Sequence, residues 1–499
     1  MAQMMLGSGV LVSIGYRSFS AVPVCAIASG AVFFLIPAII NGFPFVFPDS
    51  ADYLVFTPHI YRSPFYGLFI FFFHLDRFIW GPVLVQALIA SHLVWVFVRI
   101  YAGEPRLGWF ALIVLTLGLL TSLPFFTGFI MPDFFTAVMV LAFYLLGFRR
   151  AELGRGEQIY LVLLACVAIC VHISHLPQAI ALAFLVLFLR MLLGTSPRST
   201  LRQAAILVVP IALAAGATLL NNVVIHGVFG LFPAGQTFVL ANMIEQGPAR
   251  NYLKEVCPTA GFKLCAAKDT LPATSYEILW STDTLQRLGG FEGMRDEANE
   301  IIAGTIRTRP SEVMDAVARS VAASFMVHAP GAELFPLSND PWMADVLAKK
   351  FGLETLRSYK DSLAARNLVP REFLSELDDV TFPAAVLALL AVGLLAFRRG
   401  FVDALSLGLF VLAAIVINNV LCALGSGVHD RYQARVTWLV AFSTLLILAR
   451  LFRAEEAIGI SECPTGPAAS PTVGTGGSAP SPARLRSGSA FAYDRSEVN

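Results

Sequence analysis

The sequence predicts an all-α, multi-pass membrane protein with about ten transmembrane helices and a mainly helical extracytoplasmic domain between helices seven and eight. The 499-residue chain is 57% hydrophobic and only 14% charged, whereas soluble domains carry about 25% charged residues. Its mean hydropathy is +0.71. Apolar runs long enough to approach the thickness of a bilayer recur in both halves of the chain. Lipid is therefore expected to be its main solvent.

A membrane-spanning helix needs roughly 17–25 predominantly apolar residues. The sequence contains ten candidates, some of them shorter than this: 21–41, 81–101, 109–126, 133–148, 159–173, 176–193, 204–225, 382–397, 402–424 and 436–452. The run 159–193 is too long for one span, because a single helix would extend about 50 Å through a core of roughly 30 Å. We divide it at the polar stretch before Pro177, since proline suits the first turn of a new helix.

Arginine placement predicts the orientation of these spans. With the N-terminus inside, the cytoplasmic segments hold Arg17, Arg106, Arg149, Arg150, Arg155, Arg190, Arg198, Arg202, Arg398, Arg399, Arg450 and Arg453, and the short outer segments hold Arg62, Arg77, Arg431 and Arg435. Basic residues favour the cytoplasmic side. We expect a protein of the bacterial inner (plasma) membrane with both termini cytoplasmic, and no removable signal peptide before the first span.

Four regions follow from this topology. They are an N-terminal membrane domain (1–225), an extracytoplasmic domain (226–380) with helical patterns at 291–306 and 310–328, C-terminal membrane helices (381–454) and a disordered cytoplasmic tail (455–499) rich in Pro, Gly, Ser and Ala. Cys257 and Cys265 fall outside, where they form either a disulfide or two free thiols. The net charge of +1 gives no electrostatic support for nucleic-acid binding.

Polar clusters flank the spans, and the predicted topology places all of them on the extracytoplasmic face. The first is Pro48-Asp49-Ser50-Ala51-Asp52-Tyr53. Its carboxylates are three residues apart, so one helical face presents both. Such a pair suits a general base, a divalent cation or a cationic substrate. The alternative is a helix N-cap, which explains one acidic residue more easily than two.

The same outer loop continues through Tyr61 and Arg62. A guanidinium group suits phosphate, and a tyrosine beside it can stack on a substrate or bind it by hydrogen bonds. Interfacial anchoring explains the two residues equally well, because Tyr and Arg both favour the headgroup layer. The apolar run 65–74 is too short to span easily and is expected to be an interfacial helix.

Two further clusters begin later spans. Asp133 lies at the outer start of the fourth span. It either completes a site with the first acidic pair or stabilises the helix by its interaction with the positive end of the helix dipole. His172 and His175 flank the tight turn that divides 159–193. Paired imidazoles bind phosphate, shuttle protons or ligate metals, whereas a single histidine in an apolar run is usually a packing residue.

The last cluster is His429-Asp430-Arg431-Tyr432-Gln433-Ala434-Arg435, at the start of the final span. It offers two guanidinium groups and an imidazole beside the lipid, which suits a lipid-linked phosphate. The alternative is flanking charge, although positive charge is sparse on this side of membrane proteins.

With these residues in view, the chain resembles the GT-C superfamily of polyprenyl-phosphate-dependent glycosyltransferases, which includes protein mannosyltransferases and aminoarabinose transferases. The similar features are the PDSxDY motif in the first outer loop, Asp133, the large outer insertion after the seventh span and the HDRY-type segment. The resemblance covers the membrane scaffold and not residues 226–380. Unlike the adjacent acidic pair of protein mannosyltransferases, Asp49 and Asp52 are separated by two residues.

The resemblance implies transfer of a sugar from a polyprenyl-phosphate donor to a lipid or glycan acceptor at a periplasmic active site in the cell envelope. Asp49 would then be the general base, with Asp52 and Asp133 orienting the acceptor or supporting a cation. Arg431 and Arg435 would stabilise the leaving phosphate, with His429 and Arg62. The sequence identifies no cofactor; a divalent cation is the one candidate, and whether it is needed stays open. A transporter or lipid flippase, an acyltransferase using a histidine base, and a membrane scaffold are the alternatives.

Overall fold

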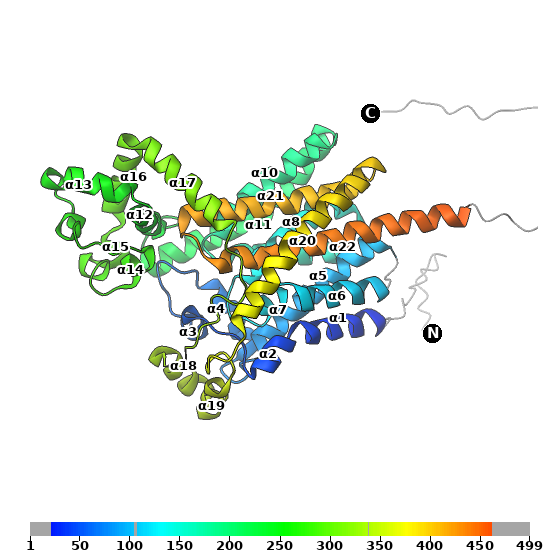
Figure 1. The fold of residues 1–499 in the computed structure, drawn as a ribbon, viewed down its shortest axis with the longest axis horizontal. Coiled ribbons are helices and arrows are strands. Elements are labelled where there is room, and N and C mark those ends of the chain that lie inside the picture. The colour runs from blue at the N-terminus through cyan, green and yellow to red at the C-terminus, as the bar shows by residue number, and fades with distance from the viewer. Residues whose placement is uncertain (1–20, 104–106, 338, 462–499) are drawn as a thin grey trace, which may run out of the picture. The chain divides into compact units, whose positions relative to one another are not determined.

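The computed structural model describes residues 21–103, 107–337 and 339–461, and the regular elements in these ranges are helices (Figure 1). One isolated parallel bridge joins Phe45 to Phe129. The predictions for residues 1–20 and for most of the tail lie outside the described residues. The described residues up to Glu455 form one compact unit. The last helix continues beyond the predicted start of the tail, to Ser461.

Six of the described helices are long and apolar enough to cross a membrane. They are α5 (Gly81–Ala102), α10 (His175–Leu192), α11 (Pro197–His226), α20 (Arg371–Arg398), α21 (Val402–Gly425) and α22 (Asp430–Ser461). Each has at least 18 residues, which lies within or above the range that a transmembrane helix requires. The chain is therefore a helical, multi-pass membrane protein, as its composition predicts.

The remaining predicted spans lie on shorter helices. These are α1 (Ala21–Phe34) with α2 (Ile36–Asn41), α6 (Leu107–Leu120) with α7 (Leu123–Thr127), α8 (Phe134–Phe148) and α9 (Arg155–Cys170). The total of ten spans stays a prediction. The division of 159–193 is confirmed as a break between helices, because α9 ends at Cys170 and α10 begins at His175. The predicted interfacial helix is α4 (Phe65–His74), and the acidic motif forms α3 (Pro48–Val55).

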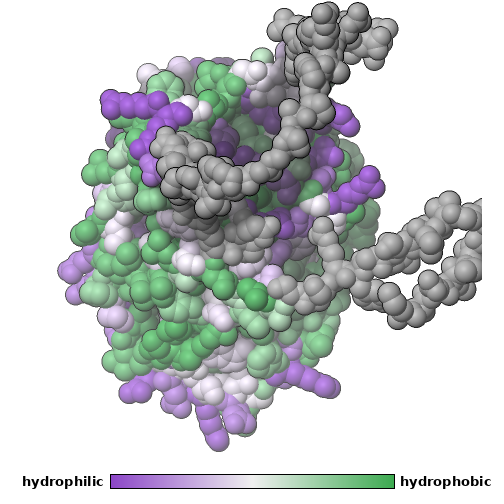
Figure 2. Space-filling model, turned by 90° about the vertical axis from the view of Figure 1, so that its right-hand side faces the viewer, coloured by the Kyte–Doolittle hydropathy of each residue, from purple (hydrophilic) through white to green (hydrophobic). Residues whose placement is uncertain are grey.

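Burial separates central from peripheral helices. The apolar windows of α5 and α22 are 67% and 72% buried, whereas those of α11 and α20 are 17% and 11% buried. α8 is buried almost throughout its length. In Figure 2, apolar side chains cover much of the face toward the viewer, with hydrophilic side chains toward its upper and lower edges. The exposed apolar faces of α11 and α20 are suited to lipid.

Arginines predicted to be cytoplasmic meet at one end of this bundle. The Arg149 Nη2 and Arg450 Nε atoms lie 3.3 Å and 3.1 Å from Asp403 Oδ2. The Arg149 guanidinium also lies 4.6 Å from the ring centre of Tyr101. One carboxylate at the start of α21 thus joins the end of α8 to α22.

The segment between α11 and α20 is also helical. It contains α12 (Gly235–Glu245), α13 (Pro248–Ala260), η2 (Lys263–Ala267), α14 (Ser275–Trp280), η3 (Gln286–Leu288), α15 (Gly290–Gly293), α16 (Arg295–Thr308), α17 (Pro310–Ser324), α18 (Pro341–Phe351) and α19 (Leu353–Asp361). The helical patterns predicted at 291–306 and 310–328 correspond to α16 and α17. A short 3-10 turn, η1 (Arg150–Glu152), lies between α8 and α9.

This segment contributes to two hydrophobic clusters. Side chains between Leu240 and Ile301 form a small separate core. Leu334, Met343 and Tyr359 belong instead to the main core of the membrane helices. Residues 334–365 are therefore packed against the bundle, and α18 contacts α3 directly.

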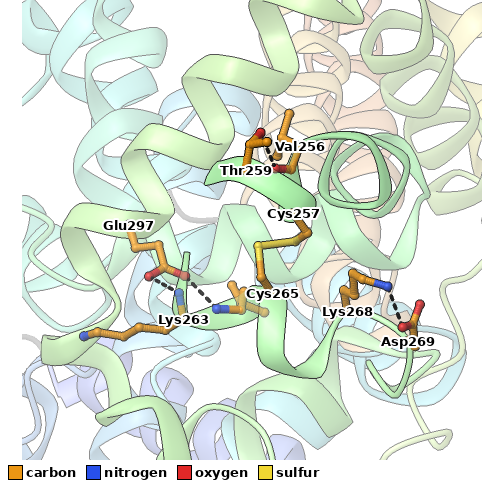
Figure 3. The surroundings of a disulfide bond; sticks show 9 residues. Val256, Cys257, Thr259, Lys263, Cys265, Lys268, Asp269 and Glu297 are labelled. Carbon is orange, nitrogen blue, oxygen red and sulfur yellow. Dashed lines mark hydrogen bonds and ion pairs between the residues drawn. A yellow bond between two sulfur atoms is a disulfide. The ribbon is translucent and has the colours of Figure 1, made fainter. Parts of the chain in front are cut away.

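A disulfide joins Cys257 at the end of α13 to Cys265 in η2 (Figure 3). Within the loop that it closes, the backbone N–H groups of Lys263 and Leu264 donate to the Glu297 carboxylate at 2.8 Å and 2.9 Å. Glu297 lies on α16. The bridged loop is thus fixed to α16, and of the two alternatives left open by the sequence, the structure shows the disulfide.

Replacing Cys257 and Cys265 together with serine should destabilise the small core. A bridge that closes so short a loop contributes about 2–3 kcal/mol by restricting the unfolded chain. Amide hydrogen exchange over residues 235–302 should therefore accelerate, while exchange in α5 stays unchanged. Cys25→Ser on α1 is the matched control. Equal protection in the double variant and the control would contradict a stabilising role for the bridge.

Candidate functional site

Arg62 joins the two carboxylates of the acidic motif. Asp49 and Asp52 lie on one face of α3, which begins with Pro48. The Arg62 Nη2 group donates to Asp49 Oδ1 at 2.7 Å, and its Nη1 group donates to Asp52 Oδ2. The Arg62 side chain is only 10% exposed, whereas that of Asp49 is 31% exposed. The guanidinium therefore bridges the two carboxylates of an acidic pair that is partly open to solvent.

Asp52 has further partners and is held firmly. The Trp342 Nε1–H group on α18 donates to Asp52 Oδ1 at 3.0 Å, and His59 Nε2 lies 3.6 Å from the same oxygen. Burial raises the pKa of Asp52, but His59 and the Arg62 charge outweigh burial and hold this pKa below its usual value. Asp52 is therefore an ionised, well-ordered carboxylate.

A second ion cluster surrounds Asp133, directly before α8. The fully buried Arg435 side chain donates to Asp133 Oδ1 at 3.1 Å, to Asn418 Oδ1 at 2.9 Å and to the Cys422 sulfur at 3.2 Å. Its guanidinium is enclosed by α21 and the start of α8, where it holds Asp133 in place. The binding of phosphate by Arg435 stays a prediction.

Arg431 lies one turn before Arg435 and is less completely enclosed by protein atoms. Its Nε atom lies 3.2 Å from Glu333 Oε2 and 3.7 Å from Asp133 Oδ1, and its guanidinium lies 4.1 Å from the ring centre of Phe47. Within the part of the chain that the structure describes, the buried Arg431 Nη1 and Asp133 Oδ2 atoms have no hydrogen-bond partner. Such buried groups are uncommon in folded proteins.

Phe47 and Tyr53 connect the two ion clusters. Phe47 immediately precedes α3 and carries Arg431 on its ring. Tyr53 is buried, with the Arg62 guanidinium 5.3 Å from its ring centre. Burial raises the pKa of Tyr53. The charge of Arg62 lowers this pKa and the charge of Asp133 raises it. Residues far apart in sequence thus form one polar region at one end of the helices.

The two histidines of the tight turn have different environments. His175 is fully buried, with Nε2 2.8 Å from the Thr136 hydroxyl and Nδ1 2.6 Å from the Ala168 carbonyl oxygen. Both of its ring nitrogens therefore join α10 to α8 and α9, and its role in substrate binding stays a prediction. His172 binds the Ser174 hydroxyl through Nδ1 at 2.8 Å and lines a pocket.

That pocket combines polar and apolar walls. The polar part is formed by Arg62, His172, Asn221 and Asn222, and the apolar part includes Phe65, Ile169 and Leu176. Its walls come from the start of α4, the turn between α9 and α10, and the end of α11. Arg62 therefore belongs both to the acidic pair and to a pocket that adjoins the lipid-suited surface of α11.

The other predicted residues lie at the edge of this region. Asp430 Oδ1 accepts from the Ala329 backbone N–H at 2.9 Å and so anchors a turn. His429 Nδ1 lies 3.7 Å from Glu333 Oε1. Tyr61 stacks on His59 with ring centres 4.8 Å apart, and the Arg62 guanidinium lies 5.6 Å from its ring centre. On its other side it contacts Trp280 and Phe291, which pack against the small core.

Sequence reasoning missed Glu333 and Trp342. Both lie between the predicted helical pattern 310–328 and the eighth span, where no periodicity indicates what they contact. The Asp340-Pro341 pair is typical of a helix start, and Asp340 indeed caps α18. Nothing in the pattern predicts that α18 packs on α3 and so directs Trp342 toward Asp52.

Within residues 21–103, 107–337 and 339–461, no three His, Cys, Asp or Glu side chains gather as a metal site would need. The divalent cation stays a prediction.

Comparisons of this chain with models of known protein families, with characterised proteins and with solved structures give no match.

Removing Asp133 should leave the Arg435 charge buried without its partner. Asp133→Ala is expected to lower the free energy of unfolding by roughly 3–5 kcal/mol, seen as a reduced midpoint of denaturant unfolding. Adding Arg435→Met to this variant should restore most of the loss. Asp283→Ala, at an exposed position, is the control. An unchanged midpoint in Asp133→Ala would show that the pair does not hold the helices together.

Proposed function

We propose that this chain is a membrane glycosyltransferase that moves a sugar from a polyprenyl-phosphate donor to a lipid or glycan acceptor. The observation that carries the proposal is the position of Arg62, which binds the Asp49–Asp52 pair and also lines a pocket with apolar walls. A lipid-linked phosphate needs a cation beside an apolar groove, and the acceptor needs a base nearby.

The site would face the extracytoplasmic side, in a topology of ten spans with both termini cytoplasmic. Two independent features support this orientation. The arginines Arg149 and Arg450 meet Asp403 at the end of the bundle predicted to be cytoplasmic. The Cys257–Cys265 disulfide belongs to the segment between α11 and α20, and disulfides persist in oxidising compartments such as the periplasm.

Asp49 is the better general base of the acidic pair. It is the more exposed carboxylate, with Arg62 as its ion-pair partner, whereas Asp52 is also bound by Trp342. The Arg62 Nη2 group occupies Asp49 Oδ1 through a hydrogen bond of 2.7 Å. A donor phosphate entering the pocket would compete for the Arg62 guanidinium, and Asp49 would then be free to accept a proton. Donor binding would thereby activate the base.

In the transfer step, the acceptor hydroxyl oxygen attacks the anomeric carbon while Asp49 takes its proton. The bond between that carbon and the phosphate oxygen breaks, and the electron pair leaves with polyprenyl phosphate. Arg62 and the Arg431 Nη1 group would stabilise the negative charge on the leaving group. Glu333 and Asp133 would keep Arg431 in position.

A transporter or lipid flippase is the alternative. Transporters commonly place their ionisable residues near the bilayer midplane, between broken helices. The acidic pair on α3 is instead bound by a loop residue and by α18, outside the six long helices. The short break between α9 and α10 is the feature that favours transport.

Asp49→Asn should lower sugar transfer by about 10²–10⁴-fold, the contribution expected of a positioned general base. The assay uses purified protein with polyprenyl-phosphate sugars and a membrane-lipid acceptor extract. Thermal stability should be unchanged, as in the control Asp361→Asn at an exposed position. Near-normal transfer by Asp49→Asn would remove Asp49 from this role. Sugar-lipid translocation by the wild type without transfer would favour the flippase.

A further inference from the structure

The loop between α3 and α4, residues 57–64, carries Arg62 but consists of turns and irregular backbone. Its first residue donates a backbone hydrogen bond to α3 at 3.1 Å. Near its other end, the Ser63 hydroxyl donates to the Cys170 carbonyl oxygen of α9. Between these attachments, the Arg62 N–H group donates within the loop, to the His59 carbonyl oxygen at 3.2 Å. The direction of the Arg62 side chain therefore depends on side-chain contacts.

Two tyrosine rings lie beside the Arg62 guanidinium. Its central carbon is 5.3 Å from the ring centre of Tyr53 and 5.6 Å from that of Tyr61. A cation at such distances is attracted to the electrons of the ring. Tyr53 belongs to α3 and is buried in the main core of the membrane helices. Tyr61 belongs to the irregular loop, so its ring must be held in place from outside the loop.

The small core holds the Tyr61 ring. Its centre lies 4.4 Å from that of Phe291 on α15 and 5.2 Å from that of Trp280 on α14. These two rings lie 5.3 Å and 6.3 Å from the ring of Phe238 on α12. All three pack against the small core. Tilted and edge-to-face pairs of this kind are more favourable than their buried area alone implies. The loop is thus docked on the small core through one aromatic side chain.

We propose that Tyr61 is a positioning residue, which holds the Arg62 guanidinium against the acidic pair by docking the loop on the small core. Its ring contacts both the small-core aromatics and the cation. The cation in turn binds Asp49 and Asp52. This gives the segment between α11 and α20 a role at the acidic pair. The effect on catalysis rests on the proposed function, in which Arg62 binds the donor phosphate.

Amide hydrogen exchange of residues 57–64 tests the docking without any substrate. With purified protein in lipid nanodiscs, Tyr61→Leu and Phe291→Leu should each accelerate this exchange roughly three- to tenfold, because each removes a ring from the contact. Tyr61→Phe keeps the ring and should leave the exchange unchanged. Phe262→Leu is the matched control, since Phe262 also packs against the small core but is not among the rings paired with Tyr61.

Steady-state transfer kinetics test the positioning of Arg62. Tyr61→Leu and Phe291→Leu should lower kcat/KM for the polyprenyl-phosphate donor roughly three- to tenfold, about the effect of one cation–π contact. The KM for the acceptor should stay unchanged, because Tyr61 acts through the cation that binds the donor. Tyr61→Phe should restore the wild-type donor kinetics. A role in general stability would instead lower the yield of folded protein and leave both KM values unchanged.

The two proposals fail separately. Unchanged exchange of residues 57–64 in Tyr61→Leu overturns the docking, and so does equal acceleration by Phe262→Leu and Phe291→Leu. Accelerated exchange with unchanged donor kinetics overturns the positioning of Arg62. If the wild type transfers no sugar, the proposed function fails, whereas selective acceleration by Tyr61→Leu and Phe291→Leu still supports the docking of the loop on the small core.

Discussion

The buried ion pair between Asp133 and Arg435 is the interaction on which the polar region depends. It joins the start of α8 to α22 across 302 residues of sequence, in surroundings where a single unpaired charge is very costly. Because Arg435 is enclosed, the same helix presents Arg431 one turn earlier, beside Glu333 and the ring of Phe47. Charges in an apolar environment thus fix the relative positions of helices that apolar packing alone leaves free to slide.

A second constraint is that the three arginines of the polar region have different surroundings. All three guanidinium nitrogens of Arg435 bind protein atoms, whereas within the described residues the buried Arg431 Nη1 has no hydrogen-bond partner, and Arg62 binds a carboxylate pair that is partly open to solvent. In the proposed transferase, the structural charge is therefore separated from the charges that respond to substrate. The segment between α11 and α20 adds Trp342 and Glu333 to this region.

Much of the helical layout follows from sequence because lipid imposes a simple rule: apolar runs become helices of bilayer length. Pro177 even indicates the break before α10. The site is less predictable, since Arg431 and Arg435 lie four residues apart on one helix and only their neighbours distinguish them. Burial of Arg435 depends on Asn418 and Cys422 of α21, and the role of Trp342 depends on α18 packing against α3. Such contacts between distant segments leave no periodic signal in the chain.

Site-directed labelling tests most directly whether these residues share one extracytoplasmic site. Single cysteines would replace Pro58, His429 or Arg198 in a chain whose other free cysteines are removed, and intact cells would be treated with a membrane-impermeant maleimide. The account predicts that positions 58 and 429 label from outside and that position 198 labels only after the membrane is opened. Labelling of 58 and 429 from opposite sides would contradict it.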